Sequence, residues 1–404
     1  MPSTFSWLDY SEHERRKMLD VIQLFGERVT RDELGLASVR DAFADKLFPG
    51  TSTIQTRARY FLFVPWIYQL AELKGWKSAV AAERIRKEEV KLINALAKSD
   101  DHTGVIGIVA KENVRRLASS VYWQGLSTWG IRLFPGSQDE YVRSLDVYNA
   151  RHQAHNQSSR EFDGESSRGP GANWHPALPA RPNDFPEQAS FALSRLEADY
   201  LREQILHHCP DSLLAYFVRE RIPPTGTTFV WEMNLSLPPT LAEWVEHGQN
   251  FSDVLHGAAL LYNLMLSQAQ HWEEQEAHYQ TELSAWWSTL AARFDALRHW
   301  DRQRFWSLVG QQNPRVHSRA RKFIDGWIDC VLASPDQAAV SEGRSTRNLV
   351  QLREQQLKGG LSRLSNLRAR ELWQAGGGAA GADQLDLRWR PTQRFLNDLI
   401  VAWE

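Results

Sequence analysis

A mainly α, multi-helical protein is what the sequence predicts, with an N-terminal helix-turn-helix-like domain followed by a larger helical domain. Apolar residues recur three and four positions apart through most of the chain, which is the spacing of a buried helix face. Capping boxes stand before several of these runs, and alternating strand patterns are rare. The best strand candidates are residues 227–231 and 384–389. We therefore expect helices to form the core.

The N-terminal helices are predicted from their caps. Ser or Thr followed three positions later by Asp or Glu occurs at residues 11–14, 30–33 and 38–41, and each pair begins an expected helix. Gly35 interrupts the second helix, and the Pro-Gly pair that follows the third helix ends it. A further helix is expected over residues 52–64. Helical periodicity then continues over residues 78–98, 110–130 and 138–148.

Composition divides the chain into four segments. Residues 1–148 form an N-terminal helical domain that contains the helix-turn-helix-like pair. Residues 149–188 are polar, rich in Gly, Pro and Ser, and without period, which is typical of a flexible linker or long loop. Residues 189–335 are helical in pattern, and residues 336–404 form a basic C-terminal segment. Within residues 286–297, apolar residues at helical spacing predict a buried stripe.

The overall composition is that of a globular protein, with 42% hydrophobic and 24% charged residues among 404. Seventeen tryptophans are spread along the chain, and we expect most of them to be core residues. Only Cys209 and Cys330 are present, which argues against a disulfide framework and fits a reducing cytoplasm. No run of apolar residues approaches the length of a signal peptide or membrane span, so a cytoplasmic protein is expected.

Charge is distributed unevenly along the chain, although the net charge is only −2. Residues 189–288 hold 4 Arg and 13 Asp or Glu, a local charge of −9. Residues 289–404 hold 18 Lys or Arg and 12 Asp or Glu, a local charge of +6, which leaves +1 for the first 188 residues. Either the acidic and basic segments pair within the fold, or the basic end meets a polyanion while the acidic end is turned away.

The densest cluster of binding chemistry lies in LFPGTSTIQTRARYFLF, residues 47–63. In a helix over residues 52–64, the C-terminal half is apolar nearly all round, while the N-terminal half presents Thr53, Gln55, Arg57 and Arg59. Hydroxyls and a helix N-terminus can bind phosphate, Arg can bind phosphate or guanine, and Gln can read adenine. The preceding helix and tight turn make this a helix-turn-helix-like nucleic-acid contact.

A purely structural interpretation of the same cluster remains open. Arg57 and Arg59 can instead pair with Asp41 and Asp45 on the surface of a packed helix pair. Helix pairs joined by a short turn are common in all-α proteins, so the pattern alone does not decide between these readings.

Two further basic sets are candidates for nucleic-acid contact. Residues 115–132 begin with Arg115 and Arg116, end with Arg132, and resemble a recognition helix. Gly125 in the middle of that helix would lower its stability by about 1 kcal/mol relative to Ala. The C-terminal segment supplies Arg344, Arg347, Lys358 and Arg363. The span 298–322 adds Arg298, Arg302, Arg304, Arg315, Arg319, Arg321 and Lys322. Such basic density suits phosphate contact, and it suits docking on the acidic segment equally well.

Catalytic motifs are absent from the sequence, including phosphate-binding loops, zinc-protease helices and nucleophile elbows. The closest approach to a metal site is HWEEQEAH, where His271, Glu274 and His278 share one helical face. No second ligand set accompanies it, so a solvated helix face is the alternative. We expect neither a metal nor a cofactor, and no catalytic residue is assigned.

The chain resembles an uncharacterised bacterial family that is known only as a domain of unknown function. The resemblance rests on five landmarks: FSWLDYSE (5–12), DELGLASVRDAF (32–43), LFPGTSTIQTRARYFLFVPWIY (47–68), SSVYWQGLSTWGIRLF (119–134), and LSNLRARELW (364–373) with LDLRW (385–389). It implies a component of mobile bacterial defence loci, beside genes for helicase-like and phospholipase D-like nuclease proteins. No activity comes with the resemblance.

The leading functional hypothesis is a non-catalytic, nucleic-acid-associated accessory subunit of a bacterial antiviral defence system. DNA is the expected nucleic acid, and helicase-like and nuclease-like proteins of the same locus are the expected partners. The first alternative is a protein-interaction scaffold that makes no nucleic-acid contact. The second is a metal-dependent hydrolase with a site assembled from distant carboxylates and histidines.

Overall fold

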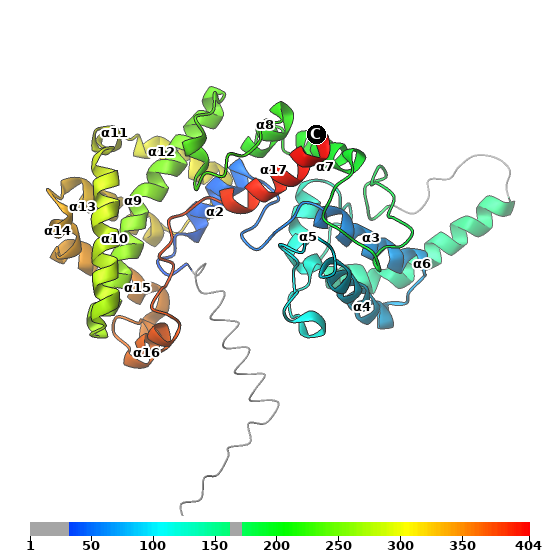
Figure 1. The fold of residues 1–404 in the computed structure, drawn as a ribbon, viewed down its shortest axis with the longest axis horizontal. Coiled ribbons are helices and arrows are strands. Elements are labelled where there is room, and N and C mark those ends of the chain that lie inside the picture. The colour runs from blue at the N-terminus through cyan, green and yellow to red at the C-terminus, as the bar shows by residue number, and fades with distance from the viewer. Residues whose placement is uncertain (1–31, 162–171) are drawn as a thin grey trace, which may run out of the picture. The chain divides into compact units, whose positions relative to one another are not determined.

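The computed structural model describes residues 32–161 and 172–404, with side chains described outside residues 155–171. The prediction of a mainly α fold is confirmed, because helices dominate these residues (Figure 1). The described chain contains no strand, only an isolated antiparallel bridge between Arg132 and Trp174. The strand predictions are therefore wrong: residues 227–231 lead into a 3₁₀ turn, and Trp389 begins a helix. The helix expected from Ser11 lies outside the described residues.

The helices differ widely in length, and η marks a short 3₁₀ helix. In chain order they are α2 (Ala37–Leu47), α3 (Tyr60–Leu73), α4 (Ser78–Leu96), η2 (Lys111–Asn113), α5 (Ala118–Thr128), α6 (Gln138–Glu161), α7 (Arg195–His208), α8 (Leu213–Glu220), η3 (Val230–Met233), α9 (Pro239–Ala269), α10 (Glu273–Ala291), α11 (Phe294–Arg298), α12 (Arg302–Gln312), α13 (Ser318–Ala333), α14 (Gln337–Ser341), α15 (Arg344–Lys358), η4 (Gly359–Leu361), α16 (Leu367–Ala375) and α17 (Trp389–Trp403). Among the described residues, no helix combines the length and the apolar character needed to cross a bilayer.

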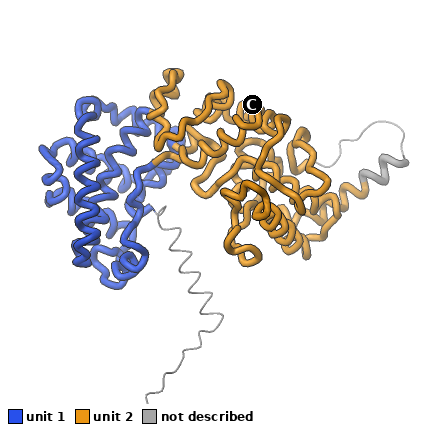
Figure 2. Tube along the Cα trace, in the orientation of Figure 1, with its two compact units in different colours: residues 1–43, 246–385 blue, residues 44–245, 386–404 orange. Residues whose placement is uncertain are grey.

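The chain divides into two compact units, each made of two separate stretches (Figure 2). Unit 1 comprises residues 1–43 and 246–385, of which the structure describes those from Asp32 onward. Unit 2 comprises residues 44–245 and 386–404. The last helix, α17, therefore folds with the N-terminal half of the chain in unit 2.

Unit 1 is organised around the part of α9 that follows Val245. Every residue from Leu260 to Leu266 is buried, so this helix has neighbours on all sides, as expected for a sequence that is apolar all round. The ring of Trp286 on α10 packs against Gly257, where any side chain would collide with it. The Trp286 indole also donates a hydrogen bond to the carbonyl of Asp253 at 2.7 Å. Helix α10 is thereby fixed along α9.

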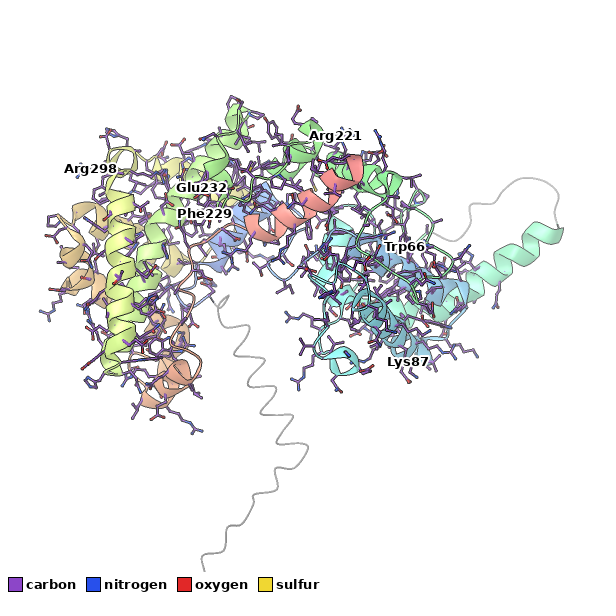
Figure 3. All side chains as sticks on the ribbon, in the orientation of Figure 1. Trp66, Lys87, Arg221, Phe229, Glu232 and Arg298 are labelled. Carbon is purple, nitrogen blue, oxygen red and sulfur yellow. The ribbon has the colours of Figure 1, made fainter. Side chains whose placement is uncertain are left out.

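Unit 2 is organised around α3, whose residues are buried from Tyr60 to Tyr68. This helix contacts α4, α5 and α6. Phe61 stacks on Trp129 with ring centroids 3.8 Å apart. Trp66, labelled in Figure 3, donates from its indole to the Pro179 carbonyl at 2.8 Å. The apolar half of the motif at 47–63 is thus a core anchor, because large rings give much buried area at each position.

Two of the predicted element boundaries are wrong. Residues 32–36 form a turn rather than a helix, and the Asp32 carboxylate accepts the backbone N–H of Leu36 and Ala37 at 2.5 and 2.7 Å, at the start of α2. Residues 149–161, expected in a linker, continue α6. They contain neither Gly nor Pro, and a polar helix needs no apolar period when it is exposed.

The stripe predicted over residues 286–297 is confirmed in part. Trp286, Leu290 and Leu297 are buried, but α10 ends at Ala291 and a separate short helix, α11, carries Leu297.

Candidate nucleic-acid interface

The helix predicted over residues 52–64 begins instead at Tyr60. Residues 51–59 form turns and irregular backbone, and several of their N–H groups donate to side chains rather than within a helix. The Gln55 side chain accepts from Ser52 N–H at 3.0 Å, and the Tyr122 hydroxyl accepts from the N–H of Thr56 and Arg57 at 2.9 and 3.0 Å. These side-chain bonds, one local and two from α5, hold the backbone outside a helix, so the N-terminal face expected of a recognition helix does not form.

Gln55 is a buried structural residue, only 3% exposed. Its amide donates to the carbonyls of Gly50 and Val121 at 3.2 and 3.4 Å and so joins the segment to α5. By contrast, Thr53 and the neighbouring Ile54 are exposed.

Arg57 is held between two carboxylates. Its guanidinium lies 2.8 Å from Asp398 of α17, with Nε donating to both carboxylate oxygens, and 2.5 Å from Asp101. The Phe191 ring lies 4.4 Å from the guanidinium carbon and covers one face of it. Burial raises the pKa of Asp398, and the hydrogen bonds from Arg57 limit that rise. The Arg57 side chain is only 13% exposed, so this Arg ties unit 2 together internally.

Arg59 is also paired. It lies 2.8 Å from the buried carboxylate of Glu197 on α7, and it donates to the carbonyl of Ser190 at 2.9 Å. The proposed surface pairing of Arg57 and Arg59 with Asp41 and Asp45 is therefore wrong in its partners, although the expectation of carboxylate partners is correct. Asp398 and Glu197 lie more than one hundred residues along the chain from these arginines, so no local pattern could indicate them as partners.

The second candidate set is divided by burial. Arg115 and Arg116 are exposed between η2 and α5. Arg132 is 5% exposed; it donates to the carbonyls of Trp123 and Gly136 and stacks on the Trp123 ring at 4.7 Å. Burial lowers the pKa of Arg132. Arg132 thus supports the loop after α5, while Arg115 and Arg116 remain at the surface.

The C-terminal candidates separate into two pairs. Lys358 and Arg363 both lie against the buried Glu33, at 2.5 and 2.9 Å. Lys358 also contacts Glu354, and the hydroxyl of the buried Tyr262 donates to Glu354 at 2.5 Å. We call these five residues the Glu354 network, and it joins the turn before α2 to α9 and α15 inside unit 1.

Glu354 is the acceptor at the centre of this network. Burial alone would raise the pKa of its carboxyl, but hydrogen bonds from Ser362 and Tyr262 and the charge of Lys358 outweigh burial and lower the pKa. A carboxylate with so many donors is an ionised structural group, so Lys358 is satisfied within the fold.

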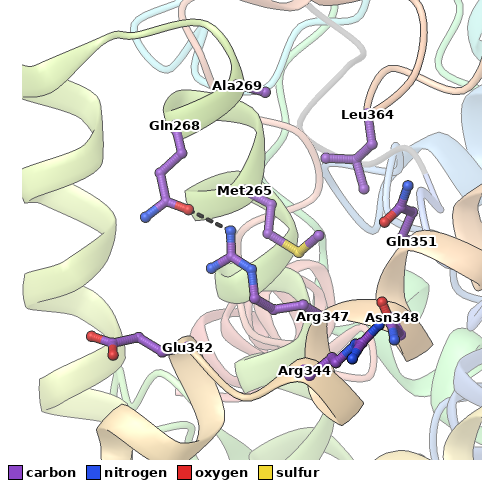
Figure 4. Close-up of a pocket in the computed structure, with 9 residues that line it drawn as sticks. All are labelled: Met265, Gln268, Ala269, Glu342, Arg344, Arg347, Asn348, Gln351 and Leu364. Atoms are coloured by element: carbon purple, nitrogen blue, oxygen red, sulfur yellow. Dashed lines mark hydrogen bonds between the residues drawn. The ribbon is translucent and has the colours of Figure 1, made fainter.

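Arg344 and Arg347 line a cavity of about 580 Å³ between α9 and α15 (Figure 4). Arg347 donates to the Gln268 side chain at 2.6 Å and to the Ser341 carbonyl at 2.8 Å. Arg344 is exposed and makes no hydrogen bond or ion pair with the described residues. The cavity therefore has two guanidinium groups in its lining: that of Arg347 is held by hydrogen bonds, and that of Arg344 has no partner among the described residues.

A further group of cations lies around the start of α13: Arg315 precedes the helix, and Arg319 and Lys322 lie in its first turns. All three side chains are exposed, and none is paired with a carboxylate among the described residues. By contrast, Arg302 lies 2.5 Å from Asp329, and Arg321 lies 3.6 Å from Asp325. In the sequence, all of these cations fall in one basic span, because the sequence does not show which of them will be paired with carboxylates in the fold.

The histidine-rich stretch does not assemble a metal site. Among the described residues, no group of three His, Cys, Asp or Glu side chains is placed to hold a metal ion. His271 lies before α10 in a left-handed backbone conformation, with φ at 54°, whereas Glu274 and His278 lie exposed on the helix. The shared helical face predicted for the three residues is therefore wrong for His271.

Family comparison confirms that the chain resembles a family of unknown function. Residues 2–403 match a family described only as a family of unknown function, DUF6361. The chain belongs to this DUF6361 family. No curated protein and no solved structure matches it.

The landmark motifs of this DUF6361 protein meet one another inside each unit. In unit 2, residues 47–68 and 119–134 are joined through Tyr122 and Gln55, and Arg388 of the LDLRW motif donates to the Thr51 carbonyl at 2.9 Å. In unit 1, Glu33 of the DELGLASVRDAF motif pairs with Arg363, directly before LSNLRARELW. These contacts give the motifs an architectural role.

Proposed function

We propose that this DUF6361 protein is a non-catalytic, nucleic-acid-associated accessory subunit of a bacterial defence system. The observation that carries the proposal is the group of unpaired, exposed cations Arg315, Arg319 and Lys322 at the N-terminal end of α13. Arg319 and Lys322 are three residues apart and share one helix face. Cations without carboxylate partners are available to replace the counterions of a phosphate backbone, which is the main source of nucleic-acid affinity.

Four other predicted contacts stand at the surface: Thr53, Arg115, Arg116 and Arg344. The proposal retains Thr53, Arg115 and Arg116 as phosphate contacts, whereas Arg344 lines the cavity between α9 and α15. Arg57 and Arg59 are assigned to the interior of unit 2, because their guanidinium groups are bound to carboxylates. DNA is the proposed nucleic acid, and helicase-like and nuclease-like proteins of the same locus are the proposed partners. The defence role and these partners are supported by the resemblance of the landmark motifs.

A titration of labelled single-stranded and duplex DNA into the full chain tests the proposal. Binding should be detectable at about 50 mM salt and should weaken by at least an order of magnitude at about 200 mM. The double variant Arg319→Ala/Lys322→Ala should weaken binding on every sequence, because phosphate contacts carry no sequence information.

The matched control is Lys87→Ala on α4, where an exposed Lys is already paired with Glu83 at 2.6 Å (Figure 3). It should leave DNA affinity unchanged. Absence of DNA binding at low salt, or equal losses in the Lys87 and Arg319/Lys322 variants, would remove the basis for the proposal.

A second candidate function, a protein-interaction scaffold, is favoured by exposed leucines in unit 1. Leu352, Leu357, Leu361, Leu367 and Leu372 are 43–73% exposed within a short stretch of chain. Exposed apolar residues at this density are typical of protein contact sites. Co-purification of neighbouring gene products that resists nuclease treatment and is lost in a Leu361→Ser/Leu367→Ser variant would support the scaffold. Loss of partners on nuclease treatment would favour the nucleic-acid role.

A further inference from the structure

The cavity between α9 and α15 has the size and the polarity of a small-molecule site. Its volume of about 580 Å³ lies within the range of roughly 300–1,000 Å³ that holds small organic ligands and cofactors. Its lining combines cations, an acid, amides and apolar side chains from α9, the α14–α15 connection, α15 and the segment after η4 (Figure 4). We propose that this cavity binds a nucleoside phosphate, a ligand beyond the nucleic-acid contact proposed for α13.

The phosphate would lie on the Arg344 and Arg347 side of the cavity. Arg347 is already oriented by Gln268 and Ser341, and its guanidinium carries more N–H donors than the two used in these bonds. Arg344, at the first turn of α15, makes no hydrogen bond or ion pair with other described side chains. Arg is the residue best suited to phosphate, because its planar fork can donate two parallel hydrogen bonds.

The rest of the lining suits a nucleoside better than a bare phosphate. Among the described residues, Glu342 is the one acid that lines the cavity, and a carboxylate can accept hydrogen bonds from ribose hydroxyls. Met265 and Leu364 offer apolar contact to the face of a base, and thioether sulfur packs well against aromatic rings. The amide of Gln351 can donate to and accept from a base edge. With two Arg and one Glu, the lining carries a net charge of +1, which favours an anionic ligand.

Calorimetric titration of the full chain with AMP, GMP, CMP and UMP tests the site, with adenosine, ribose 5-phosphate and inorganic phosphate as parallel arms. At least one nucleotide should bind, and more tightly than inorganic phosphate and than its own nucleoside. Arg344→Ala should weaken that binding roughly 10- to 100-fold, because it removes charge-assisted hydrogen bonds. Gln351→Ala should change the preference among the four bases.

The control is Arg368→Ala, which removes an exposed Arg from α16, outside the cavity lining. It should bind the nucleotide as the wild type does, and circular dichroism should show all variants folded. No binding by any nucleotide at millimolar concentration would overturn the proposal, as would equal binding of inorganic phosphate or equal losses in the Arg344 and Arg368 variants. The Arg319/Lys322 variant should keep its nucleotide affinity, so failure of this site and failure of the DNA proposal are separable.

Discussion

Replacement of Arg57 by Ala should destabilise unit 2 rather than remove a ligand contact. The substitution leaves the Asp398 carboxylate, whose side chain is 8% exposed, without its cation. Breaking a buried ion pair from one side costs about 3–5 kcal/mol, because an uncompensated charge stays in a low-dielectric site. Asp398 keeps one donor, the N–H of Ala58 at 2.8 Å, so we expect about 3 kcal/mol, at the lower end of that range.

Urea unfolding followed by circular dichroism measures this loss, and a double-mutant cycle assigns it. Asp398→Leu combined with Arg57→Met should cost clearly less than the sum of the two single substitutions, since the pair leaves together. The control is Asp101→Ala, which removes the second partner of the same Arg. Asp101 is 55% exposed, so its loss should cost no more than about 1 kcal/mol.

One pattern of results would contradict the structural role of Arg57. In that pattern, Arg57→Ala unfolds at the same urea concentration as the wild type, the cycle is additive, and DNA affinity falls. Arg57 would then be a ligand contact whose pairing with Asp398 has no energetic weight.

Three other substitutions follow from the burial or the packing of single residues. Burial raises the pKa of Glu89 to about 7, so the folded state binds this proton more tightly than the unfolded state. The free energy of unfolding should therefore fall as pH rises from the ordinary pKa of Glu toward pH 7, by up to about 3 kcal/mol relative to the Glu89→Gln variant. Urea titrations at several pH values measure this difference, and parallel pH profiles of the two proteins would contradict it. A Cβ at Gly125 would lie 2.3 Å from the Gly50 carbonyl oxygen, so Gly125→Ala should lower stability by about 1–3 kcal/mol. The control is Gly310→Ala on α12, where a Cβ meets nothing within 4 Å, and it should instead raise stability by about 0.5–1 kcal/mol. Equal urea midpoints for the two Ala variants would show that the close contact at Gly125 does not determine stability.

The sequence predicts the helical class well, because helical spacing and caps are local signals. Helix α4 begins at Ser78, as its periodicity indicates, and the apolar residues of α3 are buried. The start of α3 could not be predicted in the same way. It depends on the Tyr122 hydroxyl and the Asp398 carboxylate, which reach the backbone of residues 56–58 from α5 and α17.

The candidate site shows the same division between local and distant information. The residue type indicates that an Arg side chain can bind phosphate. Whether its guanidinium is available to a ligand depends on whether a carboxylate of the fold already pairs with it. Arg57 and Arg363 are paired by carboxylates far along the chain, whereas Arg344 and Arg319 are exposed without such partners. Gly125 is a further case. In a recognition helix it would only lower helix stability, whereas in the structure its missing side chain lets the Gly50 carbonyl pack directly against α5.

The salt dependence of DNA binding tests the central claim most directly. The slope of log K against log salt should become less negative by about 2 in Arg319→Ala/Lys322→Ala, since each lost phosphate contact changes it by about 0.9. The slope should remain that of the wild type in Lys87→Ala. An unchanged slope in the Arg319/Lys322 variant, or no binding to DNA at about 50 mM salt, would contradict the claim that the basic end of α13 meets a phosphate backbone.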